Sequence, residues 1–244
     1  MMPFKKFKQL FVEIRETKET LDFHGKKLDE IYWSSVFNSS IAGSKWLINT
    51  SFNPGRWAAG YPMLYILFRI YNDIHPKNIL EFGLGESTKL AYQYHSYFPN
   101  STLKIIEQDE KWLQFFSNEI YDVISNTLIL EIEKIKIQGQ EVFQYQALLA
   151  SLPKQKYDLI IIDGPWGSEH YSRYQIIDLL EEDLIASQFI IIMDDYERSG
   201  EKQTIAKLKE SFNKKGIQYE ETIYSGIKET YLICSKNYKF LTSL

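Results

Sequence analysis

Residues 78–94 read NILEFGLGESTKLAYQY. An apolar run containing Glu81 breaks into a turn with Gly83 and Gly85, and helix-forming residues follow. This order predicts a buried strand, a tight turn and a helix. Glycines permit positive φ and let the backbone approach a ligand closely, and the amides that open a helix favour an anionic group. The stretch therefore predicts a turn that binds a nucleotide or a nucleoside.

Strand and helix patterns alternate along most of the chain. Strands are expected at 78–82, 102–108, 128–137, 157–163 and 189–195, and helices at 61–74, 87–98, 110–120, 142–152, 174–184 and 201–215. Residues 217–236 read as two further strands around Ser225-Gly226. We expect an α/β fold with a Rossmann-like, doubly wound sheet of about seven strands, mostly parallel and closed by an antiparallel C-terminal hairpin.

Residues 51–244 are expected to form this α/β domain, and residues 1–50 an N-terminal helical extension. Apolar residues in 4–33 recur at helical spacing between charges, which predicts an amphipathic helix or helix pair. Two roles of this N-terminal extension are open. In the first, the helices pack on the domain or on a second subunit, which would give a homo-oligomer. In the second, the basic segment KKFKQLF rests on a membrane surface.

The composition narrows the class of protein. Against 28 basic residues stand 32 acidic ones, so a dedicated nucleic-acid binder is disfavoured. The single Cys234 excludes an internal disulfide and fits a reducing compartment. No stretch approaches the roughly 20 apolar residues of a spanning helix, and the N-terminus resembles neither a signal peptide nor an anchor. We expect a cytoplasmic protein.

Three kinds of ligand compete for the glycine turn. A P-loop is rejected because the required lysine is missing. A dinucleotide fingerprint needs a third glycine where this chain has Thr88, and it leaves Glu81 unexplained. Glu81 suits an ammonium group, and Glu107 at the end of the next strand is placed to accept both ribose hydroxyls. An amino acid joined to adenosine, S-adenosylmethionine (SAM), fits all of these groups.

Residues from about 60 to 236 resemble the class I methyltransferases. The matching parts are EFGLGEST, the acid in KIIEQDEKW, the strands YDLIIID and FIIIMDD, and the closing hairpin. The resemblance implies that SAM is bound by Glu81, Gly83, Gly85, Ser87, Thr88, Glu107 and Asp163. The plainer alternative is that the glycines only make a tight turn and that Glu107 is a solvated strand end.

Three aspartates follow the two central buried strands, Asp163 in IIIDGPWG and Asp194-Asp195 in IIIMDDYER. Neighbouring carboxylates repel one another unless a cation is present, and Mg²⁺ prefers oxygen ligands. A cation bound here would hold substrate oxygens and lower the pKa of a hydroxyl. We therefore expect a metal site of Asp163, Asp194 and Asp195, the alternative being that Asp194 and Asp195 cap the next turn.

This arrangement is similar to the metal-dependent O-methyltransferases of catechol type. It resembles more closely those acting on antibiotic sugars, the macrocin and aminocoumarin group, in which Asp-Gly follows one strand and Asp-Asp-Tyr the next. The chain departs from both, with Trp166 at the catechol-type lysine and Pro165 at the acid of the sugar enzymes. The catalytic candidates are Asp163 and, as general base, His170, although a lone loop histidine is often merely solvated.

The chain also resembles methyltransferases encoded with bacterial surface-polysaccharide genes. That resemblance implies a sugar or glycan-precursor hydroxyl as the acceptor. We expect segment 50–62 to fold over the ligand, with aromatic residues such as Trp57 and Trp166 near the crevice. Two alternatives remain open, an aminopropyl transferase that uses Asp163 and Asp194 at its acceptor site, and a non-catalytic SAM-binding scaffold protein.

Overall fold

The computed structural model describes residues 4–55, 57–120 and 123–244. Its main sheet has seven strands in the order β3-β2-β1-β6-β7-β9-β8. Their bounds are β1 Asn78–Phe82, β2 Thr102–Glu107, β3 Thr127–Ile129, β6 Tyr157–Ile162, β7 Ile185–Met193, β8 Tyr219–Ser225 and β9 Glu229–Ser235. Strands β3, β2, β1, β6 and β7 pair in parallel, whereas β9 is antiparallel to both β7 and β8. The predicted Rossmann-like sheet with an antiparallel C-terminal hairpin is confirmed.

Helices cover both faces of this sheet. They are α2 Tyr61–Asp73, α3 Glu86–Tyr97, α4 Glu110–Ser117, α5 Val123–Asn126, α6 Leu148–Ser151, α7 Gln175–Glu181, α8 Ser199–Lys215 and the 3₁₀ helix η1 Lys236–Thr242. In β6, Leu159 and Ile161 face the core under α2 and α3, while Ile160 and Ile162 face the core under α7 and α8. Because both faces are buried, the strand reads as a continuous apolar run.

The segment 128–152 differs from the expectation of one strand and one helix. After β3 the chain forms a separate antiparallel pair, β4 (Ile132–Ile137) and β5 (Gln140–Tyr145), and only α6 is helical. Gln138 and Gly139 both have positive φ, 50° and 83°. A two-residue turn of this kind favours a tight hairpin, so it pairs the two alternating segments instead of letting the second one coil.

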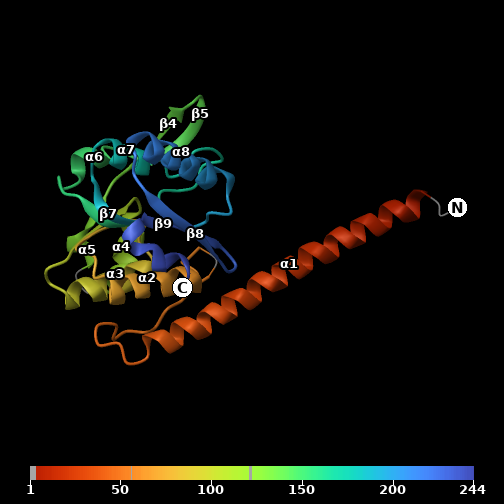
Figure 1. Ribbon diagram of the computed structural model, residues 1–244, viewed down its shortest axis with the longest axis horizontal. Helices are drawn as coiled ribbons and strands as arrows, with labels where there is room; N and C mark the ends of the chain where they lie inside the picture. The colour runs from red at the N-terminus through yellow and green to blue at the C-terminus, as the bar shows by residue number, and fades with distance from the viewer. Residues whose placement is uncertain (1–3, 56, 121–122) are drawn as a thin grey trace.

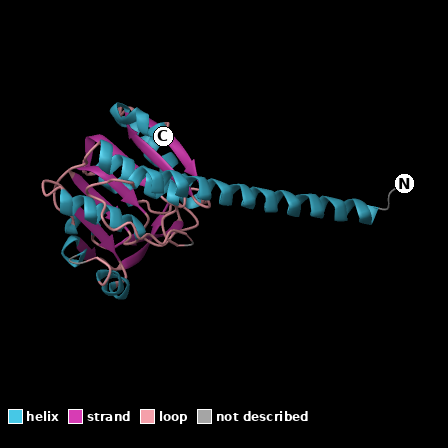
Figure 2. Cartoon of the chain, turned by 90° about the horizontal axis from the view of Figure 1, so that it is seen from below, coloured by secondary structure: helices cyan, strands magenta, loops and turns pink. Residues whose placement is uncertain are grey.

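The N-terminal segment forms one helix, α1 (Phe4–Ile41), of 38 residues. Figures 1 and 2 show it projecting far beyond the sheet and its covering helices. Near its C-terminal end the Trp33 ring packs against the rings of Tyr65 and Tyr224, with centroid distances of 5.4 and 5.6 Å, and Phe37 belongs to the core. Among the described residues, no helix combines the length and the apolar character needed to cross a membrane.

Candidate functional site

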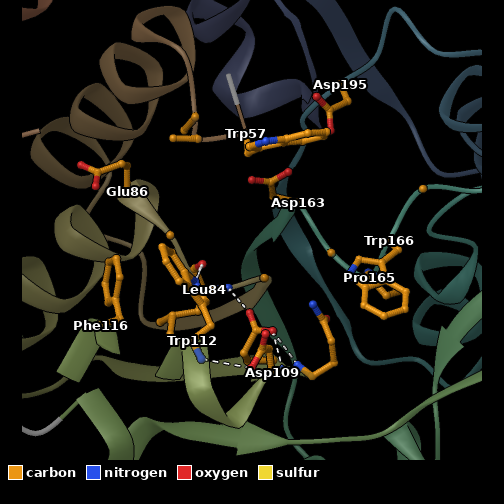
Figure 3. A pocket seen from close by; sticks show the side chains of 18 of the residues that line it. Trp57, Leu84, Glu86, Asp109, Trp112, Phe116, Asp163, Pro165, Trp166 and Asp195 are labelled. Atoms are coloured by element: carbon orange, nitrogen blue, oxygen red, sulfur yellow. Dashed lines mark hydrogen bonds between the residues drawn. The ribbon is translucent and has the colours of Figure 1, made fainter. Parts of the chain in front are cut away.

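A cavity of about 730 Å³ opens at the carboxyl ends of β1, β2 and β6 (Figure 3). It is lined by segments 83–86, 107–109 and 163–167, by side chains of α4, by Asn53, Gly55 and residues 57–59, and by Glu119, Arg173, Asp195 and Arg198. The volume lies within the roughly 300–1,000 Å³ of typical small-molecule sites. Ligands of open α/β sheets bind at this edge, so the cavity is the candidate site.

The glycine turn brings bare backbone to the cavity wall. Gly83 has φ +88°, and a Cβ at this position would lie 3.1 Å from the carbonyl carbon of Asp163. A larger residue would therefore be strained and crowded. Thr88 Oγ1 accepts a hydrogen bond from the Gly85 amide at 3.0 Å and closes the first turn of α3. Position 83 therefore requires glycine, both for the positive φ and for the short distance to the Asp163 backbone.

Glu81 lies beneath this turn and is fully buried. Ser87 Oγ donates to its Oε1 at 2.5 Å, whereas Oε2 finds no hydrogen-bond partner among the described residues. Burial raises the pKa of Glu81 to about 8, against the opposing hydrogen bonds from Ser87 and Thr88. Glu81 and Ser87 are not among the described lining residues of the cavity, so direct contact of either with SAM stays a prediction.

The raised pKa of Glu81 predicts a pH-dependent stability. Because the folded state holds this proton more tightly than the unfolded state, stability should fall as the pH rises from 4.5 toward 8. The variant Glu81→Gln is neutral at this position and should lose the part of the pH dependence that Glu81 contributes. Thermal melts across that pH range compare the two proteins, and parallel curves would contradict the prediction.

Glu107 ties the glycine turn to the start of α4. Its Oε2 accepts from the Leu84 amide at 2.9 Å, and its Oε1 accepts from the amides of Gln108 and Asp109 at 2.7 and 2.9 Å. A carboxylate offers about four acceptor sites. Three are used, so the structure leaves Glu107 room for one ribose hydroxyl, whereas we had expected it to accept both.

Aromatic side chains of α4 form a wall beside Glu107. Trp112 and Phe116 both line the cavity, and Trp112 Nε1 donates to the Leu84 carbonyl at 2.7 Å. Asp109 caps the helix by accepting from the amides of Lys111 and Trp112. Flat apolar faces of this kind suit an adenine ring. Sequence reasoning missed this wall because the same residues read equally well as core.

The three strand-end aspartates come together as the sequence predicted. One carboxylate oxygen from each of Asp163, Asp194 and Asp195 lies within 4.8 Å of the others. Strands β6 and β7 are parallel neighbours, so their carboxyl ends meet. Asp163 lines the cavity, and its side chain is 19% exposed, whereas Asp194 is fully buried.

Two buried cations that sequence reasoning missed lie inside this cluster. Arg173 contacts Asp195 Oδ2 at 2.8 Å and Asp163 Oδ1 at 3.3 Å. Lys228, from the β8–β9 turn, contacts Asp194 Oδ2 at 2.5 Å and Asp195 Oδ1 at 3.0 Å. The three neighbouring aspartates predicted that positive charge would lie close to them. Nothing in the sequence pattern indicated that Arg173 and Lys228 would supply it.

Burial and the neighbouring charges shift the pKa values of the three aspartates in different directions. Burial and the neighbouring Asp194 carboxylate raise the pKa of Asp163 to about 7, although Arg173 and Lys228 oppose the shift. Burial also raises the pKa of Asp194. For Asp195 the upward effect of burial is outweighed by Arg173 and Lys228, and its pKa is lowered.

The residues present do not fit a divalent metal ion in this arrangement. Four of the six carboxylate oxygens in the cluster already contact Arg173 or Lys228, at 2.5–3.3 Å. A metal at the same oxygens would lie against these positive groups, and like charges at such distances repel strongly. Metal binding by Asp163, Asp194 and Asp195 therefore needs Lys228 to move away first.

His170 is placed away from the predicted chemistry. Its Nδ1 lies 3.3 Å from Gln203 Oε1 on α8, and it is not among the described residues that line the cavity. The loop after β6 turns His170 toward α8, so the geometry lends no support to a role as general base, and that role stays a prediction. In contrast, Trp57 and Trp166 line the cavity as expected, and Glu86 accepts from the Asn53 amide at 2.9 Å.

Comparison with solved structures defines the class of fold. No family model matches the sequence, and no curated protein matches it. The O-methyltransferase TomG from Streptomyces achromogenes, involved in tomaymycin synthesis and solved with SAM, is similar with a TM-score of 0.52 and 12% identity, covering 87% of this chain and 97% of that one. The chain has a Rossmann-like methyltransferase fold.

Two further solved structures are similar over most of their length. PaMTH1, a methyltransferase from Podospora anserina bound to S-adenosylhomocysteine (SAH), has a TM-score of 0.48 and 13% identity, covering 97% of this chain and 98% of that one. An O-methyltransferase from Bacillus cereus in complex with SAH has a TM-score of 0.49 and 15% identity, covering 86% of this chain and 91% of that one. At these sequence identities the structural similarity shows the fold of this chain and does not show its activity.

Proposed function

We propose that this chain is a SAM-dependent O-methyltransferase whose acceptor is a hydroxyl group of a sugar or glycan precursor. The observation that carries the proposal is one cavity in which the Gly83–Gly85 turn, Glu107 and Asp163 meet. The backbone at the turn would hold the methionine part, Glu107 one ribose hydroxyl, and Trp112 with Phe116 the adenine. The dimensions of the cavity and the donor set both suit SAM.

SAM supplies an electrophilic methyl group on a sulfonium. The protein holds the acceptor hydroxyl in line with that group, which is the main catalytic contribution expected of such a site. Asp163 and Asp195 both line the cavity, and Asp163 is the more exposed of the two, with 19% of its side chain accessible against 5%. Asp163 therefore receives the hydroxyl proton as the new oxygen–carbon bond forms and the carbon–sulfur bond breaks, releasing SAH. Arg173 and Lys228 hold Asp163 and its neighbours in place.

We propose that these two cations take the place of a metal ion in neutralising the cluster. The ion pairs at 2.5–3.3 Å support this. The same pairs disfavour an aminopropyl transferase, because Asp163 and Asp194 are already engaged and less able to bind a diamine. Trp57 and Trp166 are 87% and 62% exposed at the cavity, and such aromatic faces favour a sugar acceptor in polysaccharide biosynthesis.

Calorimetric titration of SAH into the purified protein tests the cofactor. We expect micromolar binding that is the same with Mg²⁺ and with a chelator. No binding in either condition would overturn the methyltransferase proposal. Binding that appears only with Mg²⁺ would restore the metal site predicted from the sequence.

Transfer of a labelled methyl group from SAM to nucleotide sugars, glycans, phenols and proteins tests the acceptor. The control enzyme is Asp163→Asn, which should still bind SAH but lose about 10²–10⁴-fold in transfer rate, the usual contribution of a positioned base. Turnover confined to phenols or proteins would exclude a sugar acceptor. Binding of SAH without methyl transfer to any acceptor would favour a non-catalytic scaffold protein.

A further inference from the structure

Helix α1 carries a stripe of apolar residues at alternating spacings of four and three. The stripe, called the seam below, consists of Leu10, Ile14, Leu21, Leu28 and Ile31, with Thr17 and His24 at the two remaining positions of the same pattern. Spacings of four and three give a period of seven residues, the repeat of a coiled coil. This regularity is not needed for a helix that packs once against a globular domain.

The seam faces away from the rest of the chain. Its apolar members are 43–67% exposed, including Leu28 and Ile31 where α1 has already reached the body. The contacts with the body come from Glu30 and Trp33, each two residues further along. Two residues correspond to about 200° around a helix. The seam thus lies opposite the surface by which α1 is held.

A second copy of this chain is the occupant that the seam fits. In a parallel pair the residues beside the seam meet across it, so Glu13 of one copy lies near Lys18 of the other, twice by symmetry. Residues 10–31 contain six acidic and four basic side chains. With Lys5, Lys6 and Lys8 included, the whole of α1 carries six acidic and seven basic side chains. Acidic residues thus accompany the basic ones along the seam, which disfavours an anionic membrane surface, because such a surface binds helices with a lysine- and arginine-rich face.

We propose that the seam joins α1 of two copies as a parallel two-stranded coiled coil. The pairing places both catalytic bodies at the same end of the helices. It also steadies a helix that is anchored beside the active site. Glu30 accepts from the Tyr61 amide at 2.6 Å and from the Ile227 amide at 3.0 Å, and the next residue, Lys228, neutralises Asp194.

Light scattering over a series of protein concentrations tests the pairing. We expect the full chain to have twice the mass of the 28.8 kDa monomer. The double variant Leu21→Glu/Leu28→Glu should halve that mass and leave the melting temperature of the body unchanged, since both side chains are exposed in the monomer. Phe23→Glu is the matched control, an apolar residue off the seam that is 50% exposed, against 65% for Leu21 and 67% for Leu28. A monomeric wild type, or a dimer that survives the double variant, would overturn the proposal.

Oxidative cross-linking tests the orientation. His24→Cys should form a disulfide between two copies, because a seam residue lies opposite itself only in a parallel, in-register pair. Val12→Cys, exposed but off the seam, should not, and the buried Cys234 does not compete. Absence of the His24→Cys cross-link in a dimer would overturn the parallel arrangement. Binding of a monomer to anionic vesicles would assign the seam to a membrane instead.

Discussion

Replacing Glu107 by alanine is expected to weaken SAH binding by about 100-fold, because one hydrogen bond to a charged group contributes about 1.5–3 kcal/mol. The same change removes the acceptor that holds the Leu84 amide, so the glycine turn also loses its support. Calorimetric titration measures the affinity, and a thermal melt reports the accompanying loss of stability.

The matched control for this prediction is Glu110→Ala, an exposed acid in the first turn of α4. It removes the same charge close to the cavity without touching the turn, so its affinity should stay near that of the wild type. An unchanged affinity in Glu107→Ala would show that the cavity does not hold the ribose at this acid.

Replacing Lys228 by methionine is expected to destabilise the protein by about 3–5 kcal/mol, the usual cost of leaving buried charges without their partner. The side chain is 11% exposed and contacts both Asp194 and Asp195. Removing its charge should also open an oxygen site for a divalent ion. Mn²⁺ or Mg²⁺ should therefore raise the melting temperature of Lys228→Met and leave that of the wild type unchanged.

Lys202→Met is the control, since the Lys202 side chain is half exposed and its Nζ lies 4.0 Å from Glu229 Oε2. It should melt like the wild type with and without divalent ions. If Mg²⁺ stabilises the wild type as much as it stabilises Lys228→Met, the aspartates bind metal in the native protein, and the sequence-based metal site is correct.

Local patterns predicted the elements well where local physics decides them. The run through Gly83 and Gly85 reads as strand, turn and helix because a short apolar segment, a glycine turn and a helical segment are each recognisable within a few residues. The prediction failed at 128–152, where the turn at Gln138-Gly139 pairs two alternating segments. Strand preference there depends on the partner strand and not on the segment alone.

The same division holds at the site. The sequence by itself determined that Asp163, Asp194 and Asp195 would converge, because residues that end neighbouring parallel strands must meet at one edge of the sheet. Only the tertiary structure decided that Arg173 and Lys228 neutralise them and that His170 turns away. These three residues lie on loops, and the path of a loop is determined by long-range packing that no local pattern encodes.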